Sequence, residues 1–254
     1  VLASGAVVRQ VLLSAGAEES QIMAKLQPIA TDMHALGNPW ISYSVYLNNS
    51  FLPGLLQLMI LLVTVFSIGS EMKRATSREW LRTADDSIII AITGKLIPQT
   101  IIFFSMGLLY LSLLYGYLHF PMHNSIWHMI FAMFLLVVAS QSFAVIIMCF
   151  APSLRIGLSV GGLVGVLSLS IAGFSFPVPA MYLPFQAISY VLPVRHYFLI
   201  YVDQALNGIP LYYSRVHYVA LILFAVASTP LLPRLKKALM RQVYVCLLYT
   251  SPSP

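Results

Sequence analysis

The chain has 254 residues, of which 59% are hydrophobic and only 9% are charged, and its formal net charge at pH 7 is +6. Soluble domains carry about 25% charged residues, so this composition excludes a soluble enzyme, whose fold could not bury so much apolar surface. A lipid bilayer can surround such a chain, and the basic residues then need an explanation other than nucleic-acid binding.

Five stretches are apolar and long enough to cross a bilayer, for which a helix needs about 20 residues. They are approximately Phe51–Ser70, Leu96–Leu118, Ile126–Phe150, Ile156–Phe174 and Val216–Leu232. Pro98 falls near the start of the second stretch, where a helix tolerates proline. The sequence therefore predicts an all-α membrane protein, with a transmembrane domain over residues 51–240.

The basic residues indicate how these spans are oriented. Ten of the fourteen Lys and Arg residues lie in three places that strict alternation puts on the same side: residues 73–95, Arg155 and residues 234–241. The positive-inside rule places that side, and the C-terminus, in the cytoplasm. We therefore expect a multi-pass protein of the cell's inner (plasma) membrane, with residues 1–50 outside the cytoplasm.

The two ends of the chain lead to separate expectations. Residues 1–50 are moderately polar and are interpreted as the C-terminal part of an extracytoplasmic domain. Nothing in the chain would translocate them, so we expect that an upstream membrane helix is missing and that an intact chain has about six spans. Residues 241–254 form a C-terminal tail whose last residues continue no pattern, and we expect those to be non-native.

The segment Glu71–Arg82 is charged and is predicted to be one helix. Arg74, Arg78 and Arg82 recur every four residues on one face, and Trp80 lies on another, where it suits the headgroup layer. This pattern predicts an amphipathic helix at the cytoplasmic interface. Two compatible interpretations stay open: an anchor on anionic lipid, or a lever on which a cytoplasmic partner pushes.

Two further segments have distinctive patterns. Glycines recur every four residues in the fourth span, at Gly157, Gly161 and Gly165. This spacing lets two helix backbones approach closely. The close approach could lie within one subunit, between two subunits of a dimer, or where two helices move against each other.

The outer segment from residue 175 to 197 is apolar but cannot be one helix. It predicts short pieces that dip into the outer leaflet, with a surface loop as the alternative, and its marked residues are Phe176, Pro177, Pro179, Pro184 and Pro193.

The sequence also lacks several features that other functions require. None of the eight acidic residues lies in the middle of a predicted span, as ion-coupled transporters usually need, and no phosphate-binding glycine motif is present. His119, His123 and His128 do not have metal-ligand spacing, and neither do the two cysteines. We expect no catalytic residues, no metal and no cofactor in this chain, so any energy should come from another one.

Several motifs, taken in order, resemble the type-2 ATP-binding-cassette (ABC) exporter permeases, in the branch with a large extracytoplasmic domain. Glu71–Thr76 resembles the family's charged coupling element, Ile92–Pro98 its glycine-lysine entry into the next helix, and Phe174–Pro179 with Ser189–His196 its re-entrant outer segment. The resemblance covers about residues 30–240. One departure is Ala75, where the family usually has glycine, which leaves the local turn open.

This resemblance implies a permease subunit that moves substrate outward with energy from a separate ATPase. The implied partners are a cytoplasmic ABC ATPase that binds ATP and Mg, a second permease copy or paralogue, membrane lipids and a periplasmic adaptor. The implied coupling residues are Glu71, Lys73, Arg74, Thr76, Arg78 and Glu79. The alternatives are a transporter or channel that does not use ATP, and a membrane scaffold protein.

Overall fold

The computed structural model describes residues 43–173 and 177–241. Within these ranges the chain is helical and contains no strand, and five helical stretches are long and apolar enough to cross a membrane. They are Leu47–Arg74, Ile88–Tyr117, Ile126–Phe150, Leu154–Ile171 and Leu211–Arg241. This confirms the expected all-α membrane fold with five spans.

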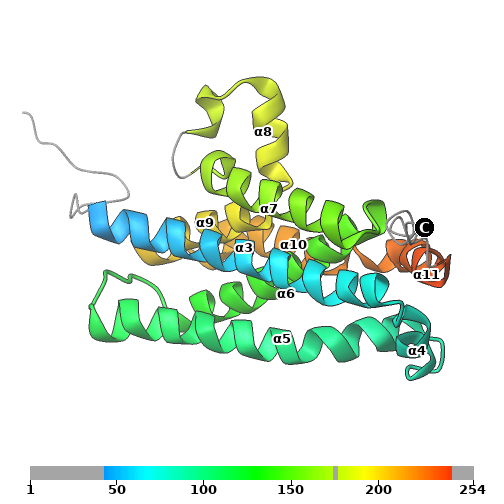
Figure 1. The fold of residues 1–254 in the computed structure, drawn as a ribbon. Coiled ribbons are helices and arrows are strands. Elements are labelled where there is room, and N and C mark those ends of the chain that lie inside the picture. Colours follow the sequence, from blue (N-terminus) through cyan, green and yellow to red (C-terminus); the bar gives the residue numbers. More distant parts are fainter. Residues whose placement is uncertain (1–42, 174–176, 242–254) are drawn as a thin grey trace, which may run out of the picture. The chain divides into compact units, whose positions relative to one another are not determined.

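The helices follow one another along the chain with short connections, as Figure 1 shows. The elements are α3 (Tyr43–Arg74), α4 (Ser77–Arg82), α5 (Ile88–Leu111), the π-helical turn η1 (Ser112–Tyr117), α6 (Ile126–Phe150), α7 (Leu154–Ile171), the short turn η2 (Val178–Ala180), α8 (Leu183–Tyr190), α9 (Pro193–Tyr201), the π-helical turn η3 (Val202–Leu206), α10 (Leu211–Val226), the short turn η4 (Thr229–Leu231) and α11 (Leu232–Arg241).

The first helix begins earlier than the sequence analysis placed it. Residues 43–50 were assigned to an extracytoplasmic domain, but they form the start of α3. Residues 1–42, on which the rest of that interpretation depends, lie outside the described residues, as do residues 242–254 of the tail. The candidate membrane span within this helix begins at Leu47, four residues before the predicted start at Phe51.

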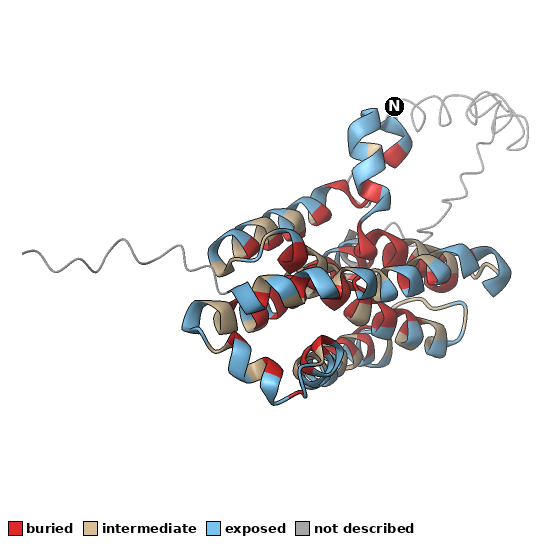
Figure 2. Ribbon diagram, turned by 90° about the vertical axis from the view of Figure 1, so that its right-hand side faces the viewer, coloured by how far each residue is buried: buried red, intermediate tan, exposed pale blue. Residues whose placement is uncertain are grey.

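Helix α6 lies at the centre of the bundle, between α3, α5, α9 and α10. It is strongly apolar and most of its residues are buried, as expected of a helix packed by others on most sides, although Phe131 and Phe134 remain exposed. Figure 2 shows buried residues of the bundle in red. The other spans expose large apolar side chains, among them Ile101 of α5 and Leu223 of α10. Such surfaces fit a lipid environment, and of the five spans α6 is the one most shielded by its neighbours.

Helix α5 corrects the expected position of Pro98. The helix begins at Ile88, so Pro98 lies in its interior rather than near its start. Polar side chains join α5 to α6 close to this proline: Thr100 Oγ1 donates to Gln141 Oε1 (2.8 Å), and Gln141 Nε2 donates to the Leu96 carbonyl (3.4 Å). Neighbouring helices and side chains are what make proline tolerable inside a membrane helix.

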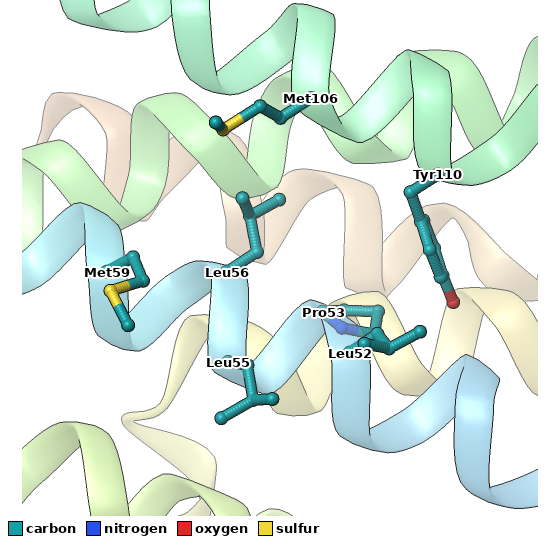
Figure 3. Close-up of a pocket in the computed structure, with 7 residues that line it drawn as sticks. All are labelled: Leu52, Pro53, Leu55, Leu56, Met59, Met106 and Tyr110. Carbon is teal, nitrogen blue, oxygen red and sulfur yellow. The ribbon is translucent and has the colours of Figure 1, made fainter.

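A second internal proline, Pro53 of α3, borders an apolar pocket between α3 and α5 (Figure 3). Proline has no N–H to donate to the carbonyl four residues earlier. The Tyr110 hydroxyl of α5 reaches this region and donates to the Asn48 carbonyl (3.1 Å), and the pocket is lined by Leu52, Pro53, Leu55, Leu56, Met59, Met106 and Tyr110. This hydrogen bond joins α5 to α3 near the pocket, at the carbonyl next to that of Asn49, which lies four residues before Pro53.

The glycines of α7 face α3 within the same chain. A Cβ on Gly165 would lie 2.3 Å from Leu58 Cδ1 and 3.3 Å from Leu58 Cα, and one on Gly157 would lie 3.0 Å from Val65 Cγ1. Gly161 also faces Val65. The three glycines therefore face α3 of the same subunit, and at Gly165 the backbone of α3 itself approaches closely, at Leu58.

The described part of the segment that the sequence analysis placed on the outer side, residues 177–197, consists of separate short helices. Pro184 is the second residue of α8 and Pro193 the first residue of α9, positions where the missing N–H costs nothing. Pro177 precedes η2 and Pro179 lies within it, and both are exposed, whereas Phe176 lies outside the described ranges. Helix α9 is buried against α3, α6 and α10, but α8 is mostly exposed.

The buried helix α9 is attached to α3 and α7 through one glutamine. Gln57 Oε1 accepts the backbone N–H of Val194 (2.8 Å) in the first turn of α9, while Gln57 Nε2 donates to Ser168 Oγ of α7 (3.1 Å). The side chain thus satisfies an N–H that has no partner inside its own helix. Three helices meet at this point in the bilayer-spanning part.

The α3–α7 contact predicts different outcomes for two glycines of α7. Gly165→Ala should destabilise the fold by about 1–3 kcal/mol, because the added methyl overpacks against Leu58. Gly162→Ala is the matched control on the same helix: its Cβ would meet only Leu62 Cδ2, at 3.8 Å, and alanine favours a helix. Thermal unfolding in detergent measures both, and equal melting temperatures would contradict the predicted contact.

Candidate functional site

Most basic residues of the described chain gather at one end of the bundle, where α3 ends and α4 and α11 lie (Figure 1). We call the exposed surface of residues 73–86 and 232–241 the basic platform. Its exposed cations are Lys73, Arg74, Arg78, Arg82, Arg234, Lys237 and Arg241, and its exposed acidic residues are Glu79, Asp85 and Asp86. The platform therefore presents an excess of positive charge.

The platform begins where α3 is terminated by a left-handed residue. Ala75 has φ +65°, and two backbone hydrogen bonds close the helix end: Thr76 N to Glu71 O (3.1 Å) and Ala75 N to Met72 O (3.4 Å). These two bonds are those of a Schellman motif, which is usually built on glycine. The sequence analysis had not decided the conformation at Ala75. The structure shows the turn that glycine favours at this position, although the residue is alanine.

This turn corrects the expectation of a single helix over Glu71–Arg82. The chain leaves α3 at Arg74 and starts α4 at Ser77, so the cations at four-residue spacing belong to two helices. Helix α4 has only six residues; it buries Ser77 and Leu81 and exposes Arg78, Glu79 and Arg82. The physical reason is the left-handed residue, which no right-handed helix can accommodate.

Glu71 joins the end of α3 to both α4 and α5. One carboxylate oxygen is 2.5 Å from Lys95 Nζ of α5, the one ion pair between side chains in the described part of the chain. The other accepts a short hydrogen bond from the Thr76 hydroxyl. The hydroxyl of Ser77 in turn donates to the Glu71 carbonyl (3.2 Å). One half-buried residue thus fixes the start of α4.

Lys95 extends this connection to the middle of α4. Its Nζ lies 4.5 Å from the centre of the Trp80 ring, a distance at which an ammonium is attracted to an aromatic face. Trp80, which the sequence placed in the headgroup layer, is therefore also a contact between α4 and α5. We call Glu71, Thr76, Trp80 and Lys95 the charged clamp; it links α4 to two membrane-spanning helices.

Sequence reasoning included Glu71 and Thr76 among the coupling residues but not Trp80 or Lys95. The resemblance of Gly94-Lys95 to a family motif was the available signal for Lys95, and nothing in the spacing tied it to Glu71, 24 residues earlier. Lys73, Arg74, Arg78 and Glu79 lie on the exposed surface. The structure thus divides the predicted set into a half-buried pair and four exposed charges.

Helix α11 forms the second half of the platform. Leu232, Leu235 and Leu239 face the core at helical spacing, while the cations point outward. Arg78 Nη2 donates to the Met240 carbonyl (3.2 Å), and Lys236 Nζ donates to the Asp86 carbonyl (2.5 Å). The sequence analysis treated residues 234–241 only as a basic flank, although this leucine spacing was visible in it.

The histidines that the sequence analysis considered as metal ligands do not belong to a metal-binding group in the described part of the chain. Within the described ranges, no three His, Cys, Asp or Glu side chains gather where they could hold a metal ion. His123 contacts the Ala205 carbonyl through Nδ1 (3.0 Å), and His128 contacts the Ser125 carbonyl (3.2 Å). These two outer histidines have backbone partners instead.

Comparison with known proteins places this arrangement in a family. A family described as "ABC-2 family transporter protein" matches residues 2–232. The chain belongs to the ABC-2 transporter family. No curated protein and no solved structure matches it. Family membership and the five spans make it a multi-pass membrane protein and the membrane subunit of a transporter.

The Schellman motif predicts that glycine suits position 75 of this ABC-2 protein better than alanine does. Ala75→Gly should stabilise the fold by about 1 kcal/mol, because a left-handed conformation is strained for a residue with a Cβ. Ala238→Gly, inside α11, should instead destabilise it by about 1 kcal/mol. Melting temperatures in detergent should shift in opposite directions, and a lower value for Ala75→Gly would refute the assignment of the turn.

Proposed function

We propose that this chain is the transmembrane permease subunit of an ABC exporter, and that the basic platform faces the cytoplasm and receives a separate ATPase subunit. The observation that carries the proposal is the charged clamp. It connects an exposed helix of six residues to two membrane-spanning helices through one ion pair, one hydrogen bond and one cation–π contact. Force applied to α4 would therefore reach the spans.

The two faces of α4 suit this role. Leu81 is fully buried and Ser77 nearly so, which holds the helix against the bundle. Arg78, Glu79 and Arg82 point away from it and are accessible to a partner. A charged outer surface over an apolar inner one supports docking of a soluble protein, since complementary charge steers association and sets register.

Both connections of α4 to the bundle are closely defined. The Schellman motif precedes it, and a turn with positive φ at Asp85 (50°) and Asp86 (56°) follows it. Lys236 of α11 holds that second turn by its hydrogen bond to the Asp86 carbonyl. A short helix held at both ends moves with its neighbours rather than independently, as a coupling element requires.

The remaining parts of the proposal concern partners and direction. ATP and Mg would bind in the ATPase subunit, and transport would proceed outward through an assembly of two permeases, as a homodimer or with a paralogue. A periplasmic adaptor would act on the opposite side. Family membership supports the ATPase partner most directly, whereas the adaptor rests on the resemblance seen in the sequence.

Charge reversal on the platform tests the proposal. The double variant Arg74→Glu and Arg78→Glu should lower the affinity of the co-purifying ATPase subunit at least ~10-fold, equivalent to about 1.4 kcal/mol, and should abolish its stimulation by the permease. The control is Arg215→Glu, an exposed cation of α10 at the opposite end. The measurement is ATP hydrolysis by the complex in lipid nanodiscs, together with the amount of bound ATPase.

The same assay separates the lever from a simple lipid anchor. An anchor acts only through anionic headgroups, so in nanodiscs of purely zwitterionic lipid the variant and the wild type would behave alike. A lever requires the difference to persist there. Unchanged ATPase binding and stimulation in both lipid mixtures would show that Arg74 and Arg78 have no part in coupling.

A further inference from the structure

Arg195 is a buried cation in the outer half of the bundle, far from the basic platform. It is the third residue of α9 and directly follows Val194, whose backbone N–H donates to Gln57. Only 8% of its surface is exposed. Its Nη1 donates to Ser189 Oγ of α8 (3.0 Å) and to the Ala172 carbonyl beyond α7 (3.3 Å). The guanidinium carbon lies 4.6 Å from the centre of the Tyr190 ring.

These contacts do not neutralise the charge. Arg195 forms no ion pair with any carboxylate of the described residues, and its Nε has no hydrogen-bond partner among them. Asp203, the one acidic residue described in the outer half, accepts a hydrogen bond from Ser214 instead (3.0 Å). The positive charge is therefore held by a hydroxyl, a carbonyl and a ring face, all of them uncharged.

Burying an unpaired charge is expensive. An ionised group taken out of water costs several kcal/mol unless a partner of opposite charge compensates it, and inside a membrane protein such a group marks a functional site. A purely structural role would be served by a neutral donor to Ser189 and Ala172. The charge itself thus points to an anion that completes the site when it is bound.

The surroundings indicate what kind of anion fits. Helix α8, which supplies Ser189 and Tyr190, exposes large apolar side chains, including Leu183 (80%), Phe185 and Ile188. An inorganic anion would gain nothing from this surface, whereas a molecule with one acidic group and an apolar body could use both features. A guanidinium also suits carboxylate and phosphate geometry better than an ammonium does.

We propose that Arg195 binds the carboxylate or phosphate group of an amphipathic ligand whose apolar body lies along α8. The ligand is either a membrane lipid or a molecule undergoing export. Its identification as an export substrate rests on the proposed function, but the binding itself does not require an ATPase. Tyr190 supports the guanidinium from one side, and Ser189 and Ala172 fix its orientation.

A pair of probes that differ only in charge tests this site. Dansylaminoundecanoic acid and its methyl ester share one fluorescent apolar body, and their anisotropy reports binding to the permease in zwitterionic nanodiscs, with empty nanodiscs as background. The wild type should bind the acid at least ~10-fold more tightly than the ester. Arg195→Gln should remove this difference, and Arg195→Lys should retain part of it.

The control is Arg215→Gln. Arg215 is another cation that stacks on a tyrosine, at 3.8 Å from the Tyr212 ring centre, but it is exposed and lies outside the site. It should leave acid binding unchanged. Equal binding of acid and ester by the wild type overturns the proposal even if Arg195→Gln fails to fold. So does a folded Arg195→Gln protein that still prefers the acid.

The source of the ligand is decided by the lipid that stays with the purified protein. If the wild type retains phosphatidylglycerol over phosphatidylethanolamine and Arg195→Gln does not, the anion is a membrane lipid. Acid-selective probe binding without retained lipid assigns it to cargo. Neither assay contains an ATPase. If the charge-reversal test of Arg74 and Arg78 failed, the probe-binding and lipid-retention results would therefore still test the Arg195 site.

Discussion

The ion pair between Glu71 and Lys95 is the contact on which the arrangement of the basic platform depends. It joins the last turn of α3 to α5, and its two members also hold Thr76 and Trp80, which lie immediately before α4 and within it. A half-buried pair of this kind is less screened by salt than an exposed one. Because three helices share it, loss of either charge would weaken the attachment of α4 to both spans together, while the backbone hydrogen bonds of the turn and the buried Leu81 would remain.

The rest of the bundle relies on contacts that suit a lipid environment. Lipid tails are as apolar as leucine side chains, so helices in a membrane associate through close packing and a few polar contacts rather than by hiding apolar surface from water. The α7 glycines provide the close packing, and Gln57, Thr100 and Gln141 provide the polar contacts. The charged residues are left to act at the ends of the bundle.

Much of the architecture could be predicted from the sequence because it follows from length and hydropathy. The five spans and the clustering of cations at one end needed no knowledge of contacts. The local geometry of the site could not be predicted in the same way. The break at Ala75 overrides an uninterrupted helical periodicity, and the pairing of Glu71 with Lys95 depends on how α3 and α5 cross. The start of α5 at Ile88 was missed because Thr93, Gly94 and Lys95 interrupt the apolar stretch.

Helix α3 carries both Glu71 and Gln57, fourteen residues apart with no proline between them, which corresponds to roughly 21 Å of helix. The first residue belongs to the charged clamp, and the second holds the backbone N–H adjacent to Arg195. This segment is therefore a stiff strut between the two sites. If a force on α4 made this segment of α3 slide or rotate, the alignment of α9 at the other end would change. Neither the charged clamp nor the start of α9 could therefore be displaced without strain at the other.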